Sequence, residues 1–144
     1  MKNIKFKFFQ KKGIFIIPFI FFVFLACIIR PIKIVTENFE KIIICWVWDR
    51  GEVDFTNSVT GGKVKIIFNM KNGFNNFKMI TDEKTENYYT SGTYDINKFL
   101  IKEKKNEMFF CSIIGMKIKL GSYQFLLKNN CASVEVLWPP KVIF

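Results

Sequence analysis

The residue types that usually carry catalysis or bind metals are sparse in this sequence. The chain contains no histidine, which excludes Ser-His-Asp and Cys-His pairs, His-ligated zinc and an imidazole acid or base. No C-x-x-C pair is present, which argues against a structural zinc site. Ser58 precedes Gly61-Gly62 but lacks the flanking glycines of a nucleophile elbow and the Gly-Lys-Ser/Thr run of a phosphate loop. The sequence therefore predicts no enzyme, no metal and no cofactor.

A short acidic cluster, Asp82-Glu83 with Glu86, is the remaining candidate for carboxylate chemistry or calcium binding. It lacks the alternating oxygen-ligand spacing of a calcium loop. A polar turn between two strands explains the cluster better.

Three cysteines, Cys45, Cys111 and Cys131, lie beyond the N-terminal apolar run. Because their number is odd, at most one internal pair can form. Cys111 and Cys131 fall on separate predicted strands and can meet only if those strands are neighbours. Each of the three is also embedded in apolar sequence, as a small buried hydrophobe would be. We expect no obligatory disulfide.

Short polar residues near predicted turns are the candidates for contacting a ligand or a partner. Backbone donors and acceptors are free in turns, so such positions can contact a solute. The alternative is that the same side chains satisfy backbone groups at a strand end. The candidates are Asn57, Ser58, Thr60, Thr90, Ser91 and Gly92.

Residues 14–29 form an apolar run without a charge, which follows five lysines and ends at Arg30-Pro31. As a helix at 1.5 Å per residue it covers about 24 Å, the short end of what a membrane span requires. The lysines place residues 1–13 in the cytoplasm as a basic head and residues 30–144 on the extracytoplasmic side. We expect an uncleaved signal-anchor, with lipidation of Cys27 or removal of the segment as alternatives.

The net charge of +10 is shared between this head and the rest of the chain. Beyond residue 30 the lysines alternate with apolar residues, as in Lys63-Val64-Lys65 and Lys117-Ile118-Lys119. A solvated strand face explains such spacing. We therefore expect a membrane as a partner and no nucleic acid.

Apolar residues alternate with polar ones at period two over most of residues 32–138, with frequent turn residues between the runs. This pattern predicts an all-β fold of about eight short strands, an antiparallel β-sandwich or small barrel. Residues 42–48 and 108–114 are apolar on both faces, which predicts central strands. The three tryptophans are expected to pack within the fold, with a position near the membrane interface as the alternative for Trp48. The predicted core contains Val64, Ile66, Phe68, Ile118, Leu120, Phe125, Val134 and Val136.

Residues 51–64 resemble the signature of the bacterial domain-of-unknown-function family 1850, in which a strand runs into a His-Ser-Val core. Asn57-Ser58-Val59 matches that core with Asn57 in place of the histidine, Gly92 matches a later glycine, and Tyr94 replaces a second one. The resemblance implies a small extracytoplasmic domain found beside TRAP-type solute transporters, with no established reaction. The expected function is a membrane-tethered accessory or interaction domain with a solute-transporter subunit as partner; a small ligand-binding module is the alternative.

Overall fold

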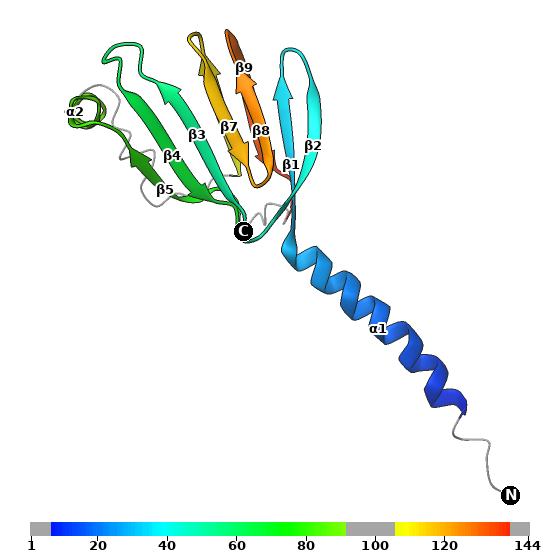
Figure 1. Cartoon of the computed structure of the whole chain (residues 1–144). Coiled ribbons are helices and arrows are strands. Elements are labelled where there is room, and N and C mark those ends of the chain that lie inside the picture. Colours follow the sequence, from blue (N-terminus) through cyan, green and yellow to red (C-terminus); the bar gives the residue numbers. More distant parts are fainter. Residues whose placement is uncertain (1–6, 92–105, 139–144) are drawn as a thin grey trace, which may run out of the picture.

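The computed structural model describes residues 7–91 and 106–138, with side chains from residue 16 onward (Figure 1). The strands of this part form a four-stranded sheet in the order β2-β1-β9-β6 and a five-stranded sheet in the order β5-β4-β3-β7-β8. Every strand pairing is antiparallel, so the predicted all-β sandwich class is confirmed. The elements are α1 (Lys7–Ile28), β1 (Ile29–Thr36), β2 (Glu40–Trp46), β3 (Arg50–Thr56), β4 (Lys63–Asn69), β5 (Asn75–Ile80), α2 (Glu83–Ser91), β6 (Glu107–Ser112), β7 (Met116–Leu120), β8 (Tyr123–Leu127) and β9 (Asn130–Val136).

The core lies between the two sheets and follows the period-two pattern of the sequence. Ile32 and Val134 point inward from the four-stranded sheet, and Val53 and Phe68 from the five-stranded sheet, all nearly inaccessible to solvent. A strand turns alternate side chains to opposite faces, so the period-two pattern gathers such residues on the buried face. Six of the predicted core residues are buried, and the other two pack against the core while partly exposed, namely Ile66 and Phe125.

The two runs predicted as central strands are instead β2 and β6, the two edges of the four-stranded sheet. Their inward residues are buried, but outward residues such as Ile42 and Phe109 face solvent. The prediction that the tryptophans pack within the fold is also wrong, because Trp46, Trp48 and Trp138 are all exposed. An apolar run shows that both faces are apolar, but it does not show which strands lie on either side.

A short helix, α2, replaces the polar turn expected at the acidic cluster. Asp82 caps it by accepting a hydrogen bond from the backbone N of Thr85 at 2.9 Å, and Glu83 and Glu86 lie in its first turn, where the helix dipole favours negative charge. Only Thr85 and Tyr89 are buried along α2. One buried i, i+4 pair is too short an apolar pattern to indicate a helix from sequence.

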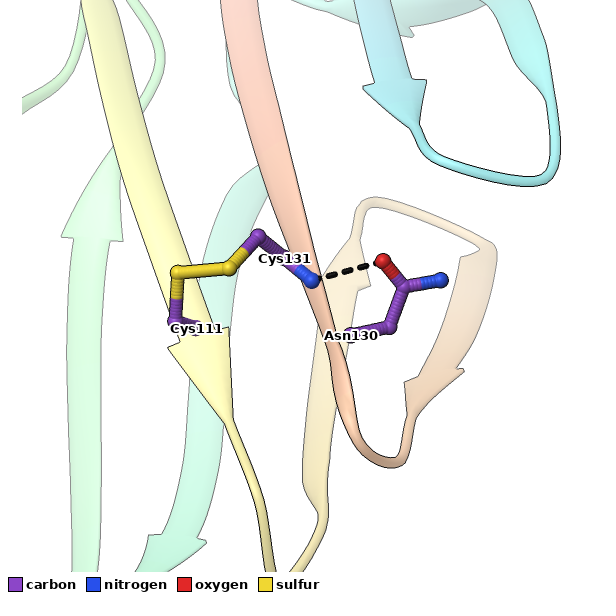
Figure 2. The surroundings of a disulfide bond; sticks show 3 residues. All are labelled: Cys111, Asn130 and Cys131. Carbon is purple, nitrogen blue, oxygen red and sulfur yellow. Dashed lines mark hydrogen bonds between the residues drawn. A yellow bond between two sulfur atoms is a disulfide. The ribbon is translucent and has the colours of Figure 1, made fainter.

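The disulfide expectation is wrong, because Cys111 and Cys131 are bonded to each other (Figure 2). The two residues are directly opposite in the register of β6 and β9, with their Cα atoms 4.0 Å apart. Two strands of the other sheet separate β6 from β9 in sequence, so their adjacency was not evident. Cys45 is buried and free, as expected of a small hydrophobe; burial, with a smaller contribution from Asp49, raises its pKa to about 12.

The N-terminal helix α1 continues directly into β1 and extends away from one end of the sandwich, with no strand alongside it (Figure 1). It contains most of the apolar run of residues 14–29 and includes Pro18. Among the residues that the structure describes, no helix meets the length and hydropathy needed to cross a membrane. The strands β1 and β3 both begin at the α1 end and run away from it (Figure 1).

Candidate functional site

The loop between β3 and β4 contains three of the predicted site residues. The side chain of Asn57 is almost fully buried. Its Oδ1 accepts hydrogen bonds from the backbone N of Val59 at 2.8 Å and of Thr60 at 2.9 Å, while its own backbone N donates to the carbonyl of Gly62 at 2.8 Å. Both acceptor sites of Oδ1 are therefore used inside the loop, and Asn57 shapes the turn from within.

A chain of hydrogen bonds joins this loop to α2. The Oγ1 of Thr85 is 3.0 Å from the carboxylate of Asp82 and 2.7 Å from the Oγ1 of Thr60. A hydroxyl has one proton, and only Thr85 can donate to the carboxylate. The Thr60 hydroxyl must therefore donate to Thr85, while it accepts from the backbone N of Gly62 at 3.2 Å.

The ionised form of Asp82 completes this chain. Hydrogen bonds from the backbone and then the side chain of Thr85 hold the pKa of Asp82 below its ordinary value. A Cβ added at Gly62 would lie 2.0 Å from the Oγ1 of Thr85, so the loop and the helix fit closely only with glycine there. Tyr89 is also buried on α2; burial raises its pKa, and the polar Asn57 side chain opposes that rise.

The other predicted site residues are not gathered at this contact. Ser58 is exposed at the tip of the loop. Thr90 donates to the carbonyl of Glu86 at 3.0 Å, and Ser91 donates to the carbonyl of Asn87; both side chains are exposed on α2. Gly92 and Tyr94 lie outside the described residues. The structure thus brings Asn57 and Thr60 together against α2, and no pocket is lined by the six residues as a set within the described part of the chain.

An open hollow of about 670 Å³ lies on the five-stranded sheet, at the end farthest from α1. No described residue of the four-stranded sheet or of α2 lines it. It therefore lies on the outer, solvent-facing side of the sheet, and we call it the lysine trough. Its lining consists of short consecutive segments from all five strands or their ends, residues 54–56, 63–65, 80–81, 115–117 and 126–128.

The lysine trough is basic. Four lysines, Lys63, Lys65, Lys117 and Lys128, line it together with one carboxylate, Asp54. Lys65 lies 3.5 Å from Asp54, and the charge of Asp54 is the main cause of its raised pKa. Within residues 7–91 and 106–138, the other three lysines form no ion pair. Lys63, Lys65 and Lys117 were predicted on solvated strand faces, but their gathering could not be predicted because only the strand register brings their separate segments together.

The junction between α1 and the sandwich is fixed by hydrogen bonds to the last carbonyls of the helix. Arg30, which is 5% exposed, donates from Nη1 to the carbonyl of Cys27 at 2.9 Å. The backbone N of Val47 donates to the carbonyl of Ile28 at 2.8 Å, and Trp138 Nε1 donates to that of Ala26 at 2.7 Å. These are the acceptors that a helix C-terminus leaves unsatisfied.

Arg30 also ties the junction to a loop distant in sequence. Its Nε donates to the carbonyl of Lys71 at 2.7 Å, across 41 positions of the chain. Burial lowers the pKa of the guanidinium, although an arginine remains charged. The helix is thereby bonded to the β2–β3 turn, to the loop after β4 and to the end of β9.

Comparison with known proteins gives no match to any family model, curated protein or solved structure.

Proposed function

We propose that this chain is a membrane-tethered domain whose β-sandwich works on the extracytoplasmic side as an accessory or interaction module. The observation that carries the proposal is the surface of α1. The large apolar side chains of residues 19–24 are each 48% to 68% exposed. Successive residues of a helix are 100° apart, so six of them cover its whole circumference.

A helix that is apolar on all sides is stable only where something covers it. Eight large apolar side chains of α1 are exposed, those of Ile16, Ile17 and residues 19–24. Covering them is worth on the order of 10 kcal/mol at 25 cal/mol per Å². The lysine head that precedes them favours a bilayer with the amino end in the cytoplasm.

No described helix has the length and hydropathy of a membrane span, and the proposal therefore depends on counting the basic end of α1 toward its length. The charge-free run covers about 24 Å, less than the hydrocarbon core of about 30 Å. The whole helix has 22 residues, or about 33 Å. Bilayers thin around short apolar segments, and lysines are tolerated near the headgroups.

The disulfide supports the extracytoplasmic side. Cys111 and Cys131 lie on the outward face of the four-stranded sheet, and Cys111 is exposed. Such bonds persist in oxidising compartments and are rare where glutathione keeps thiols reduced.

An accessory role requires a partner, because a single membrane helix cannot form a pathway for a solute by itself. The resemblance to family 1850 nominates a subunit of a TRAP-type transporter. Full-length protein extracted from membranes in mild detergent should then co-purify with a transporter subunit. Purification of the chain without a transporter subunit would rule out that partner.

The lysine trough favours a second function, the binding of a small anionic solute. Lys63, Lys117 and Lys128 offer ammonium donors above an apolar floor, a combination that suits a carboxylate with a hydrocarbon body. Titration of the full-length protein with a fatty acid tests this, with Lys117→Gln as the variant that should bind more weakly.

Alkaline carbonate extraction tests the tether. Wild-type protein should remain with the washed membranes, while the double variant Phe19→Asp, Phe22→Asp should be released, because two charges in the apolar surface oppose insertion. Phe109→Asp is the matched control; Phe109 is as exposed as those two residues but lies on the sandwich, so this variant should stay in the pellet. Release of the wild type would overturn the proposal.

A further inference from the structure

We propose that Trp46, Trp48 and Trp138 form a collar that sits in the headgroup layer of the bilayer and fixes how the sandwich stands on the membrane. This inference rests on the tether proposed above. It specifies which surface of the sandwich contacts the lipid, at what depth this surface lies, and how the sandwich is oriented as a result.

The three tryptophans come from two distant parts of the chain and lie at the same end of the sandwich, beside the junction with α1. Trp46 is the last residue of β2 and is paired in register with Ile29, the first residue of β1. The ring of Trp48 stacks on that of Trp46, with centroids 5.6 Å apart and planes 4° from parallel. Trp138 follows β9 and bonds Ala26 through its indole N–H. The collar therefore lies at the junction of α1 with β1, with Trp138 against the last turn of the helix and Trp46 opposite Ile29.

The exposure of these rings is unusual for tryptophan. Trp46 is 39% exposed, Trp48 64% and Trp138 43%, whereas tryptophan is on average highly buried in soluble proteins. Ile44 and Leu137, which are close to Trp46 and Trp138 in the chain, are also exposed. An indole combines a large apolar body with one donor, which suits a boundary between hydrocarbon and water.

The depth follows from the helix. The apolar run ends at Ile29, and the collar bonds Ala26 and pairs with Ile29, which is within one turn of about 5.4 Å. The headgroup region adds about 5 to 7 Å on each side of the hydrocarbon core. When the run lies in hydrocarbon, the collar falls in the headgroup layer. The bilayer that would cover α1 would therefore also cover the exposed surface of the collar.

The junction makes the collar and the helix one rigid unit. Val47, between two of the tryptophans, donates its backbone N–H to the carbonyl of Ile28, and Arg30 fastens the same end to the loop at Lys71. Since β3 runs away from α1 (Figure 1), the lysine trough is held at the membrane-distal end, where it faces the aqueous compartment. The collar therefore determines the side from which a solute or partner approaches.

Intrinsic fluorescence tests this directly, because the collar contains all three tryptophans of the chain. Full-length protein is reconstituted into phosphatidylcholine–phosphatidylglycerol vesicles that contain lipid brominated either near the headgroup or near the chain end. We expect quenching by the shallow bromine to exceed that by the deep bromine by about twofold or more. Absence of quenching by both lipids, or stronger quenching by the deep one, would overturn the collar.

A matched control places the reporter at the opposite end of the sandwich. In a variant with Phe at all three collar positions, Ser58→Trp puts the only indole on the exposed β3–β4 loop. Neither lipid should quench it, and equal quenching of both reporters would mean that the domain lies flat on the lipid, against the proposal. Flotation of the same vesicles separates the two proposals. Vesicle-bound protein without quenching would refute the collar only. Protein that fails to float would refute both the tether and the collar.

Discussion

Replacing Arg30 by methionine should loosen the joint between the helix and the sandwich. The variant keeps an aliphatic stem of similar length and removes three hydrogen bonds, to the carbonyls of Lys71 at 2.7 Å, Cys27 at 2.9 Å and Ile29 at 2.7 Å. A buried hydrogen bond from a charged donor is worth about 1.5–3 kcal/mol. Two of the acceptors lie within three residues of Arg30, and such local bonds persist partly in the unfolded chain.

We therefore count the bond to Lys71 in full and the two local bonds in part, which gives a loss of about 3 kcal/mol in the free energy of unfolding. For a domain of this size that lowers Tm by roughly 10 °C. Thermal unfolding of the full chain in detergent micelles, followed by near-UV circular dichroism, measures the effect.

Two variants sharpen this test. Arg30→Lys retains the charge but has no planar fork, so it should recover only part of the loss. Arg50→Met changes the other arginine, whose side chain is exposed at the start of β3, and should cost less than about 0.5 kcal/mol. If Arg30→Met unfolds at the same temperature as Arg50→Met, the junction does not depend on the guanidinium and the reasoning is refuted.

Three further results should follow. Cys111→Ser should remove the difference in gel mobility between oxidised and reduced protein and cost about 3 kcal/mol, as expected for a closed loop of 20 residues; identical mobility of the wild type in both states would contradict the bond. Gly51→Ala should destabilise by about 2 kcal/mol, because its Cβ would lie 2.0 Å from the ring of Phe68, and Phe68→Leu in the same chain should recover part of that loss, as measured in urea. Since the folded-state pKa of Asp82 is below its usual 3.8, its ionised form stabilises the docked α2 above pH 3.8, and this contribution is lost as pH falls through the lowered pKa; the protection factors of the α2 amides, which correct for the slower intrinsic exchange in acid, should fall on acidification, and Thr85→Val should abolish that dependence.

The sequence predicted which residues face the core but not how the strands are ordered. Alternation is a local property, so Val53, Ile118 and Val134 could be assigned to a buried face from their neighbours alone. The order is set by long-range pairing, such as that of β9 with β1 across most of the chain. For this reason β2 and β6 were placed at the centre, although both are edges.

The candidate site was predictable to a similar extent. An asparagine at a strand end before a glycine pair is typical of a capped turn, and Asn57 has that role. The docking of α2 on this loop could not be predicted from the sequence, because Thr85 and Tyr89 alone do not indicate a helix. The lysine trough was hidden because its lysines come together only through the register of five strands.

The tryptophans were misassigned for a related reason. In a soluble sandwich, Trp46 and Trp138 would be expected in the core, and their exposure makes sense only beside the end of α1. Sequence spacing does not show that Trp138 bonds Ala26 while Trp46, stacked on Trp48, pairs with Ile29 at the same end of α1.

The side of the membrane on which the sandwich lies can be measured directly by cysteine labelling. A single reactive cysteine is introduced as Ser58→Cys in a chain that also carries Cys27→Ala; Cys45 is buried with its pKa raised to about 12, and the other two cysteines are bonded. Intact cells are treated with a membrane-impermeant maleimide, with Lys2→Cys in the basic head as the matched control. The residue 58 variant should be labelled in intact cells and the residue 2 variant only after permeabilisation. Labelling of residue 58 that requires permeabilisation would contradict a tethered extracytoplasmic domain.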